Sequence, residues 1–305
     1  MELLEVVFSS CETLTRTRRD LRARQRAVAF APFQVLLQSI FSVLFPSDCR
    51  LCGTSLDNIS RIPVCEDCLA EIVPARVPQC VICGDRLASA QLLRGDGLCA
   101  NCRDCAPEFD RAASFGEYRE GVRGLIQLLK YESVTPVAGP LGGMLAQAIT
   151  ELLAGCADAT PLLVPVPLHK SRRRSRGFNQ SELIARAAAQ RLSQRLEVAC
   201  GALVRRRDTV SQVGLTREER IANVRDAFRV ADVAGVRGRD VMLVDDVMTT
   251  GTTLSECARI LKQAGVRRVW AATVARAYDG ADLRLAGDST SEEKEAAEVP
   301  VSASV

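Results

Sequence analysis

Histidine and aromatic residues are scarce in this chain of 305 residues, which contains 1 histidine, 1 tryptophan and 3 tyrosines. His169 is therefore the single imidazole available as a general acid, and a lone histidine in a loop is more often merely solvated. Trp270 is expected to lie in a strand and to fill core. Phe178 is the one aromatic residue within the most basic segment. Stacking of nucleic-acid bases there would have to use arginine planes.

The chain also lacks a long apolar run free of polar residues. The stretch 28–45 follows six arginines, as an export signal would, but Pro32, Gln34 and Gln38 interrupt it and no small-residue cleavage site follows. We expect an amphipathic helix that docks on the next module, with a helix lying on a membrane surface as the alternative. Without a transmembrane segment or a secretory signal, a cytoplasmic protein is expected.

Cysteine, in contrast, is abundant, with 13 residues. Gly53 and Gly84 each follow a CxxC pair, where the chain must turn so that backbone N–H groups can face the sulfurs. We predict a double zinc ribbon with two structural zinc ions; disulfides are the alternative, although CxxC geometry suits them poorly. Cys105 could replace Cys102 as a ligand. The two predicted ligand sets are Cys49, Cys52, Cys65 and Cys68, and Cys80, Cys83, Cys99 and Cys102.

Strands and helices alternate after the last CxxC pair, which predicts an α/β domain with a parallel sheet. Strands are expected over 109–118, 162–166, 241–244 and 267–274, and helices over 122–131, 141–153, 179–196 and 254–264. Thr216 and Glu219 fit a capping box for a further short helix that ends near Val224. We expect the ribbon and the α/β domain to have separate cores. The predicted divisions are a basic and amphipathic helical segment (1–45), the double zinc ribbon (46–107), the α/β domain (108–280) and a disordered tail (281–305).

The most informative segment is 241–253, which reads VMLVDDVMTTGTT. Its four apolar residues suit a parallel strand covered on both faces. Gly251 permits a tight turn, and the free N–H groups of the following helix favour an anion such as a phosphate. Asp245 and Asp246 can accept hydrogen bonds from vicinal sugar hydroxyls and can face a magnesium ion. A plain strand and helix with two solvated acids is the alternative.

At these residues the chain resembles the type I phosphoribosyltransferases, whose signature is four apolar residues, two acids, two variable residues and a Thr/Gly loop. The resemblance implies that Asp245 and Asp246 bind the ribose of phosphoribosyl pyrophosphate (PRPP) together with Mg²⁺. Purine-salvage members have an acidic general base where this chain has Thr249, and a threonine cannot take a proton at neutral pH, so purine salvage is disfavoured. The residues implied to bind the 5-phosphate are Thr249, Thr250, Gly251, Thr252 and Thr253.

A second segment, 170–207, holds 11 lysines and arginines against two acids, Glu182 and Glu197. We expect it to bind a polyanion, with a solvated basic loop as the alternative. By position it resembles the pyrophosphate-binding loop of phosphoribosyltransferases, which implies that Lys170 and Arg176 contact the substrate. The string RGFNQ at 176–180, with the ribbon ahead of it, narrows the resemblance to the ComF family of competence-associated proteins, over residues 45–277.

Two functions from different classes are compatible with this resemblance. In the first, the chain is a phosphoribosyltransferase in which Arg176 and Arg206 stabilise departing pyrophosphate while Asp245 and Asp246 hold an oxocarbenium-like ribose. In the second, it is a non-catalytic, DNA-binding or regulatory accessory of the DNA-uptake machinery that uses the pocket as a sensor. The intact arginines, acids and threonine loop favour the first function, whereas the absence of an identifiable acceptor-base pocket in the sequence favours the second.

The charge distribution indicates where DNA would bind. Residues 46–110 contain six arginines and ten acids, so the ribbon would repel a nucleic-acid backbone. We expect single-stranded DNA to contact the arginines of the N-terminal segment or those of the basic segment, namely Arg172, Arg173 and Arg174.

Overall fold

The structure, a computed structural model, describes residues 48–56, 61–154, 156, 159–209 and 216–278. The predictions for the segment 1–45 and the tail 281–305 lie outside these residues. By its contacts the chain divides into two compact units, residues 1–66 and residues 67–305. Among the described residues, no helix has both the length and the apolar character needed to cross a membrane.

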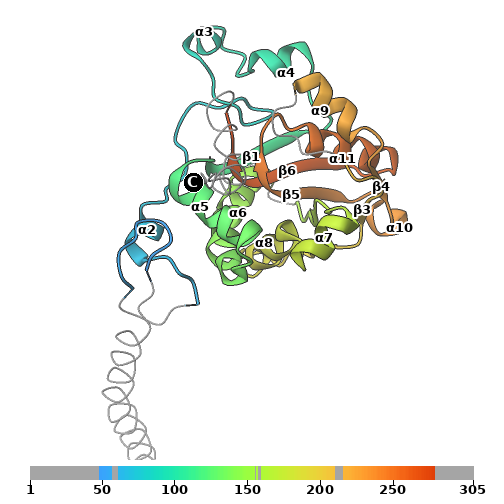
Figure 1. The fold of residues 1–305 in the computed structure, drawn as a ribbon. Coiled ribbons are helices and arrows are strands. Elements are labelled where there is room, and N and C mark those ends of the chain that lie inside the picture. Colours follow the sequence, from blue (N-terminus) through green and yellow to red (C-terminus); the bar gives the residue numbers. More distant parts are fainter. Residues whose placement is uncertain (1–47, 57–60, 155, 157–158, 210–215, 279–305) are drawn as a thin grey trace, which may run out of the picture. The chain divides into compact units, whose positions relative to one another are not determined.

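A four-stranded, fully parallel sheet lies at the centre of the unit 67–305, with the strand order β1-β6-β5-β2 (Figure 1). A separate antiparallel pair joins β3 to β4. The parallel sheet flanked by helices that the sequence predicts is therefore confirmed. The strands are β1 (Arg111–Glu117), β2 (Leu162–Pro165), β3 (Leu203–Arg205), β4 (Phe228–Val230), β5 (Asp240–Met248) and β6 (Arg268–Arg276).

Helices cover both faces of this sheet. Helix α6 packs against β1, β6 and α8, whereas α11 packs against β5, β6 and α9; Figure 1 shows α6 and α8 on one side of the sheet and α11 on the other. The helices are α2 (Glu66–Ala70), α3 (Ser89–Leu92), α4 (Ala100–Asp104), α5 (Glu120–Tyr131), the 3-10 helix η1 (Thr135–Val137), α6 (Ala138–Leu153), α7 (Lys170–Arg176), α8 (Gln180–Ala189), α9 (Arg217–Val224), α10 (Val233–Val236) and α11 (Thr252–Gln263).

The apolar run of β5 is continuous because both of its faces are buried. Val241 and Leu243 belong to one core cluster with Leu254 of α11. Met242 and Val244 are equally buried but face the other side, since side chains alternate along a strand. This alternation explains why the strand reads as an unbroken hydrophobic segment in the sequence.

The second cysteine set is part of this same core, so the expectation of separate cores is wrong for it. Cys80 and Cys102 lie in the cluster that contains Leu243 and Leu254. The backbone N–H of Ala112 in β1 donates to the carbonyl of Ile82 over 2.7 Å, which ties the ribbon to the edge of the sheet. The expectation fails because the cysteines of this set pack in one buried cluster with side chains of the sheet and of α11, which are distant in sequence.

Most element boundaries differ from the predictions by a few residues, and three differences bear on the site. The basic segment begins with helix α7, where a loop was expected; His169 caps its start and Gly177, with φ +82°, ends it. Helix α8 ends at Ala189 and not at 196, because the chain then turns to pair Val198 with Leu163 of β2. Strand β5 continues to Met248, so the two acids lie in the strand itself and not after it.

Candidate functional site

The two acids of β5 lie at the carboxyl edge of the sheet, where parallel α/β proteins usually bind ligands. Asp245 Oδ1 accepts hydrogen bonds from Ser181 Oγ over 2.8 Å and from the Asp246 backbone N–H over 3.0 Å. Asp246 Oδ1 lies 2.8 Å from Nζ of Lys130 on α5. Asp246 Oδ2 is buried and has no hydrogen-bond partner among the described residues. A buried carboxylate oxygen without a donor fits a ligand that supplies one, such as a sugar hydroxyl, or a metal ion.

Asp245 and its neighbour Lys130 both have pKa values shifted by their surroundings. Burial, and then the charge of Asp246, raise the pKa of Asp245 to about 7. Burial alone would lower the pKa of Lys130, but its hydrogen bond and charge attraction to Asp246, together with the charge of Asp245, raise the pKa. Lys130 therefore stays charged beside Asp246, and Asp245 is the acid that titrates near neutral pH.

The segment Arg176–Gln180 positions Ser181 for this contact. Asn179 caps α8 by accepting from the Ser181 N–H over 3.2 Å, and its amide donates to the carbonyl of Val166 at the end of β2 over 3.0 Å. The cap fixes the first turn of α8 beside β5, so the Ser181 hydroxyl points at Asp245. Sequence reasoning missed Ser181, although the cap pattern was its signal, and missed Lys130, for which the sequence holds no local signal.

The predicted phosphate loop connects β5 to α11. Gly251 adopts φ +74° immediately before Thr252, the first residue of α11. Thr250 Oγ1 and Thr252 Oγ1 lie 2.7 Å apart. A hollow of about 40 Å³ is lined by Asp245 and by the loop residues Thr249, Gly251, Thr252 and Thr253. The positive end of the α11 helix dipole and these hydroxyls suit an anion next to the acids.

The basic residues fall into two groups by their contacts. Arg176 donates to Gln180 Oε1 over 2.5 Å and is half-buried. Arg172 donates to the carbonyl of Thr209 over 3.0 Å, and Arg173 lies 3.5 Å from Glu182 Oε2. The exposed side chains at the start of α7, in the turn after β3 and on the outer face of α7 are Lys170, Arg206 and Arg174.

His169 lies at the start of α7 and not at the acids. Its Nδ1 is 2.9 Å from Ser171 Oγ and 3.1 Å from Asp208 Oδ2. The Ser171 hydroxyl also donates to Asp208 over 2.6 Å. These contacts join α7 to the turn after β3. The role of His169 is therefore to position these two segments.

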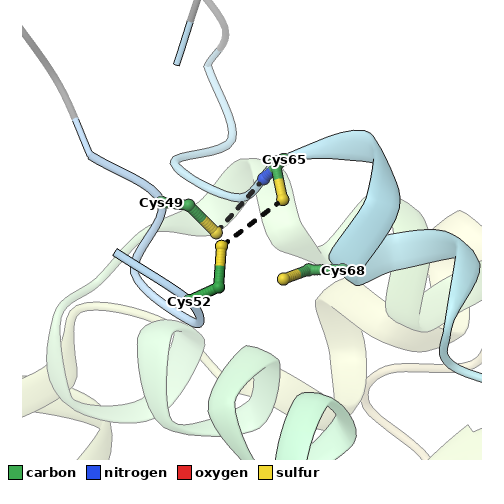
Figure 2. A group of neighbouring side chains, drawn as sticks. All are labelled: Cys49, Cys52, Cys65 and Cys68. Carbon is green, nitrogen blue, oxygen red and sulfur yellow. Dashed lines mark hydrogen bonds between the residues drawn. The ribbon is translucent and has the colours of Figure 1, made fainter. Parts of the chain in front are cut away.

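Both predicted cysteine sets come together. In each, the four sulfur atoms lie within 4.8 Å of one another, and Cys105 lies outside the second set. Tetrahedral zinc with Zn–S bonds of about 2.3 Å requires sulfurs about 3.8 Å apart; the distance is 3.7 Å for Cys52–Cys65 and 3.6 Å for Cys83–Cys99. Figure 2 shows the first set with its sulfurs facing a common point. Gly53 and Gly84 have φ +77° and +69°, as the turns after the CxxC pairs require.

A cavity of about 720 Å³, which sequence reasoning missed, lies beside the phosphate loop. Thr249, Thr250 and Thr252 line it. Other parts of its wall come from α9, from the residues after β6 and from the second cysteine set. No local sequence pattern could reveal it, because the described residues of its wall come from five separate segments.

Both the cysteine-rich part and the α/β part of the chain are similar to known protein families. Residues 40–106 match the double zinc ribbon domain family and residues 179–304 match the phosphoribosyl transferase domain family. Competence protein F of Haemophilus influenzae is 32% identical over 75% of this chain and 96% of its own length. DNA utilization protein YhgH of Salmonella typhi is 32% identical over 73% of this chain and 94% of its own.

A solved phosphoribosyltransferase from Corynebacterium diphtheriae also matches, over 53% of this chain and 95% of its own, at 17% identity and a TM-score of 0.28. The last of these similarities is too low to bear on the site. The near full-length similarity to the two curated proteins, together with a ribbon and a transferase domain in the same order along the chain, shows that the protein belongs to the ComF family.

Proposed function

We propose that this protein binds PRPP with Mg²⁺ and transfers its phosphoribosyl group to a nitrogen acceptor. The observation that carries the proposal is the buried, unpartnered Oδ2 of Asp246, because it lies in the acid pair that precedes the threonine loop. A ribose diol would supply the missing donor, and the loop would bind the 5-phosphate at the start of α11.

The roles of the residues follow from their positions. Asp245 and Asp246 would orient the ribose and stabilise positive charge at C1, while Lys170, Arg176 and Arg206 would bind pyrophosphate. In the transfer, the bond from C1 to the pyrophosphate oxygen breaks and its electron pair leaves with pyrophosphate. The acceptor nitrogen forms the new bond to C1 and releases one proton to solvent. Mg²⁺ would neutralise charge on the leaving group.

Calorimetry with PRPP tests this proposal. The wild-type protein should bind PRPP in the presence of Mg²⁺, and Asp245→Asn with Asp246→Asn should lose binding, because the ribose loses both charged acceptors. Glu151→Gln is a matched control, because it removes an exposed acid near the end of α6. Catalysis is measured separately as pyrophosphate release with pools of bases, amines and DNA. Equal affinity in the double variant would contradict the proposal.

The names of the relatives favour a second candidate, a nucleic-acid-binding role in DNA uptake. Helix α7 offers exposed arginines for it, and further DNA-uptake proteins would be its partners. A cytoplasmic location agrees with eight thiols kept reduced for zinc.

A salt titration tests this second candidate. For single-stranded DNA, each lost phosphate contact lowers the salt slope by about 0.7. Changing Arg172, Arg173 and Arg174 to alanine should therefore lower the slope by roughly 2, whereas the control Arg94→Ala in the ribbon should leave it unchanged. An unchanged slope in the triple variant would place the DNA elsewhere, and absence of salt-dependent binding would exclude the role.

A further inference from the structure

The ion pair between Lys130 of α5 and Asp246 of β5 is buried, with side chains 19% and 5% exposed. A lysine in the last turn of a helix usually stays in solvent and interacts with the final carbonyl groups. Lys130 lies instead one turn after the buried residue Ile126, on the inner face of α5, and its Nζ reaches Asp246 Oδ1 over 2.8 Å. The next residue, Tyr131, is exposed. The position of Lys130 on the helix therefore directs its charge into the protein.

Folding alone does not account for this buried pair. Removing an ammonium group and a carboxylate from water is costly, and apolar residues of similar size in their place are often as stable or more stable. Asp246 adds a second cost, because its Oδ2 is buried without a hydrogen-bond partner among the described residues. Such an arrangement is typical of a functional site, where a ligand satisfies the open oxygen.

Each of the two acids already has one oxygen engaged by a donor of this chain. Asp245 Oδ1 accepts from Ser181 Oγ and from the Asp246 N–H. Asp246 Oδ1 accepts from the ammonium group of Lys130. Mg²⁺ needs oxygen ligands, and a neighbouring ammonium group repels a divalent cation from this oxygen. Lys130 thus supplies the positive charge that a metal ion would otherwise bring to Asp246.

The same charge matters for the phosphate loop, which begins at Thr249, three residues after Asp246. A lone buried carboxylate so close to an anion site would repel a phosphate, whereas the charge of Lys130 cancels that of Asp246. Burial alone would lower the pKa of Lys130, but Asp246, Asp245 and Tyr118 raise it, so the ammonium group stays charged. The acid can then accept from a sugar hydroxyl without weakening the binding of the phosphate.

We infer that Lys130 is a positioning residue of the sugar site, which holds Asp246 with Oδ2 open to a ribose hydroxyl and makes this recognition independent of a divalent cation. The inference rests on the function proposed above, because it concerns the same site. It assigns Mg²⁺ to the pyrophosphate of PRPP and not to Asp246. A sugar phosphate that lacks pyrophosphate should therefore bind without Mg²⁺.

Calorimetry with ribose 5-phosphate and the zinc-loaded full chain tests this inference, since the probe has the ribose and the 5-phosphate but no pyrophosphate. The wild-type protein should bind it with equal affinity in the presence and absence of Mg²⁺. Lys130→Met should bind it about tenfold more weakly without Mg²⁺, because a hydrogen bond to a charged group contributes about that factor. Added Mg²⁺ should restore part of the loss, as a cation can then reach Oδ1. Lys130→Arg keeps a cation and should retain most of the affinity.

The matched control is Lys262→Met, which removes another lysine–aspartate pair of the same domain. Lys262 lies in the last turn of α11, away from the loop, and its Nζ is 2.7 Å from Asp110 Oδ1. This variant should bind ribose 5-phosphate like wild type. Inorganic phosphate is a second probe, and Lys130→Met should bind it unchanged at the threonine loop. Equal weakening of both probes would show that Lys130 only supports the fold, which overturns the inference.

The wild-type protein gives a test that does not depend on folding of a variant. The inference is overturned if ribose 5-phosphate binds only when Mg²⁺ is present, or if Lys130→Met binds it as tightly as wild type. In both cases, binding of PRPP with Mg²⁺ by the wild-type protein would leave the proposed function standing. Failure of the wild-type protein to bind PRPP with Mg²⁺ would instead contradict the proposed function, and this inference with it.

Discussion

Each of the two cysteine sets consists of two CxxC pairs, but the surroundings of the sets differ. In the first set, Cys52 is exposed and Cys65 and Cys68 are partly exposed. In the second, all four cysteines are buried among the side chains of the sheet and α11. Four cysteine ligands can thus stabilise either a local turn at the surface or the core of a domain. The difference lies in what surrounds the thiols, which the CxxC spacing does not encode.

The largest expected effect separates the two sets directly. Cys99→Ser should lower the free energy of unfolding of the transferase domain by more than about 4 kcal/mol, because it removes a metal from the core. Cys52→Ser should lower the zinc content from two ions to one and leave the main unfolding transition and PRPP binding unchanged. Metal analysis and denaturant unfolding monitored at Trp270 would measure both.

Chelation of the wild-type protein gives the same comparison without substitutions. The exposed set should lose zinc first, with no change at Trp270, and the buried set should lose it only as the domain unfolds. Simultaneous release of both ions would show that the two sets behave alike.

A smaller effect is expected from the ion pair of the sugar site, which belongs to the same unit as the second set. Lys130→Met leaves Asp246 buried without its cation and should cost about 3–5 kcal/mol in the same transition. Lys130→Met combined with Asp246→Asn should recover much of this loss, because no uncompensated charge remains. The first set should keep its zinc in both variants. If the single variant were as stable as wild type, the pair would be solvated in solution.

The remaining expected effect depends on pH. The folded protein holds the Asp245 proton up to a pKa of about 7, whereas the unfolded chain releases it near 4. The folded state therefore binds more protons between these values, and this contribution to stability is present below pH 4 and is lost as the pH rises through 7.

The difference in stability between wild type and Asp245→Asn isolates this contribution, since other acids titrate in both. The groups that face Asp245 are Asp246, Lys130, Ser181, Arg205 and Cys257. A difference that does not vary between pH 4 and 7 would contradict the raised pKa. PRPP affinity should rise over the same interval in wild type, as the ionised acid becomes available to the ribose.

Local signals made much of the fold predictable. The unbroken apolar run of β5, the capping box that joins Thr216 to Glu219 and the CxxC spacing each depend on residues close in sequence. Helix α7 was missed because its residues, KSRRRSR, have no apolar periodicity, so its caps alone define it.

The remaining features of the site depend on contacts across the chain. Lys130 and Asp246 are separated by more than a hundred residues, and Arg276 contacts Cys83 across nearly two hundred. Neither partner is unusual in its own segment. The shared core and the cavity have the same origin, because they form only when segments distant in sequence pack together.

The hydrogen bond from Arg276 to Cys83 also has a consequence for synthesis of the chain. Translation proceeds from the N-terminus, so the thiols of the second set leave the ribosome well before β6, the last strand of the sheet. Zinc can bind while the surfaces that will cover the lobe do not yet exist. The nascent lobe would then act as a preformed template, and arrival of Arg276 would complete the cavity as one of the final steps of folding.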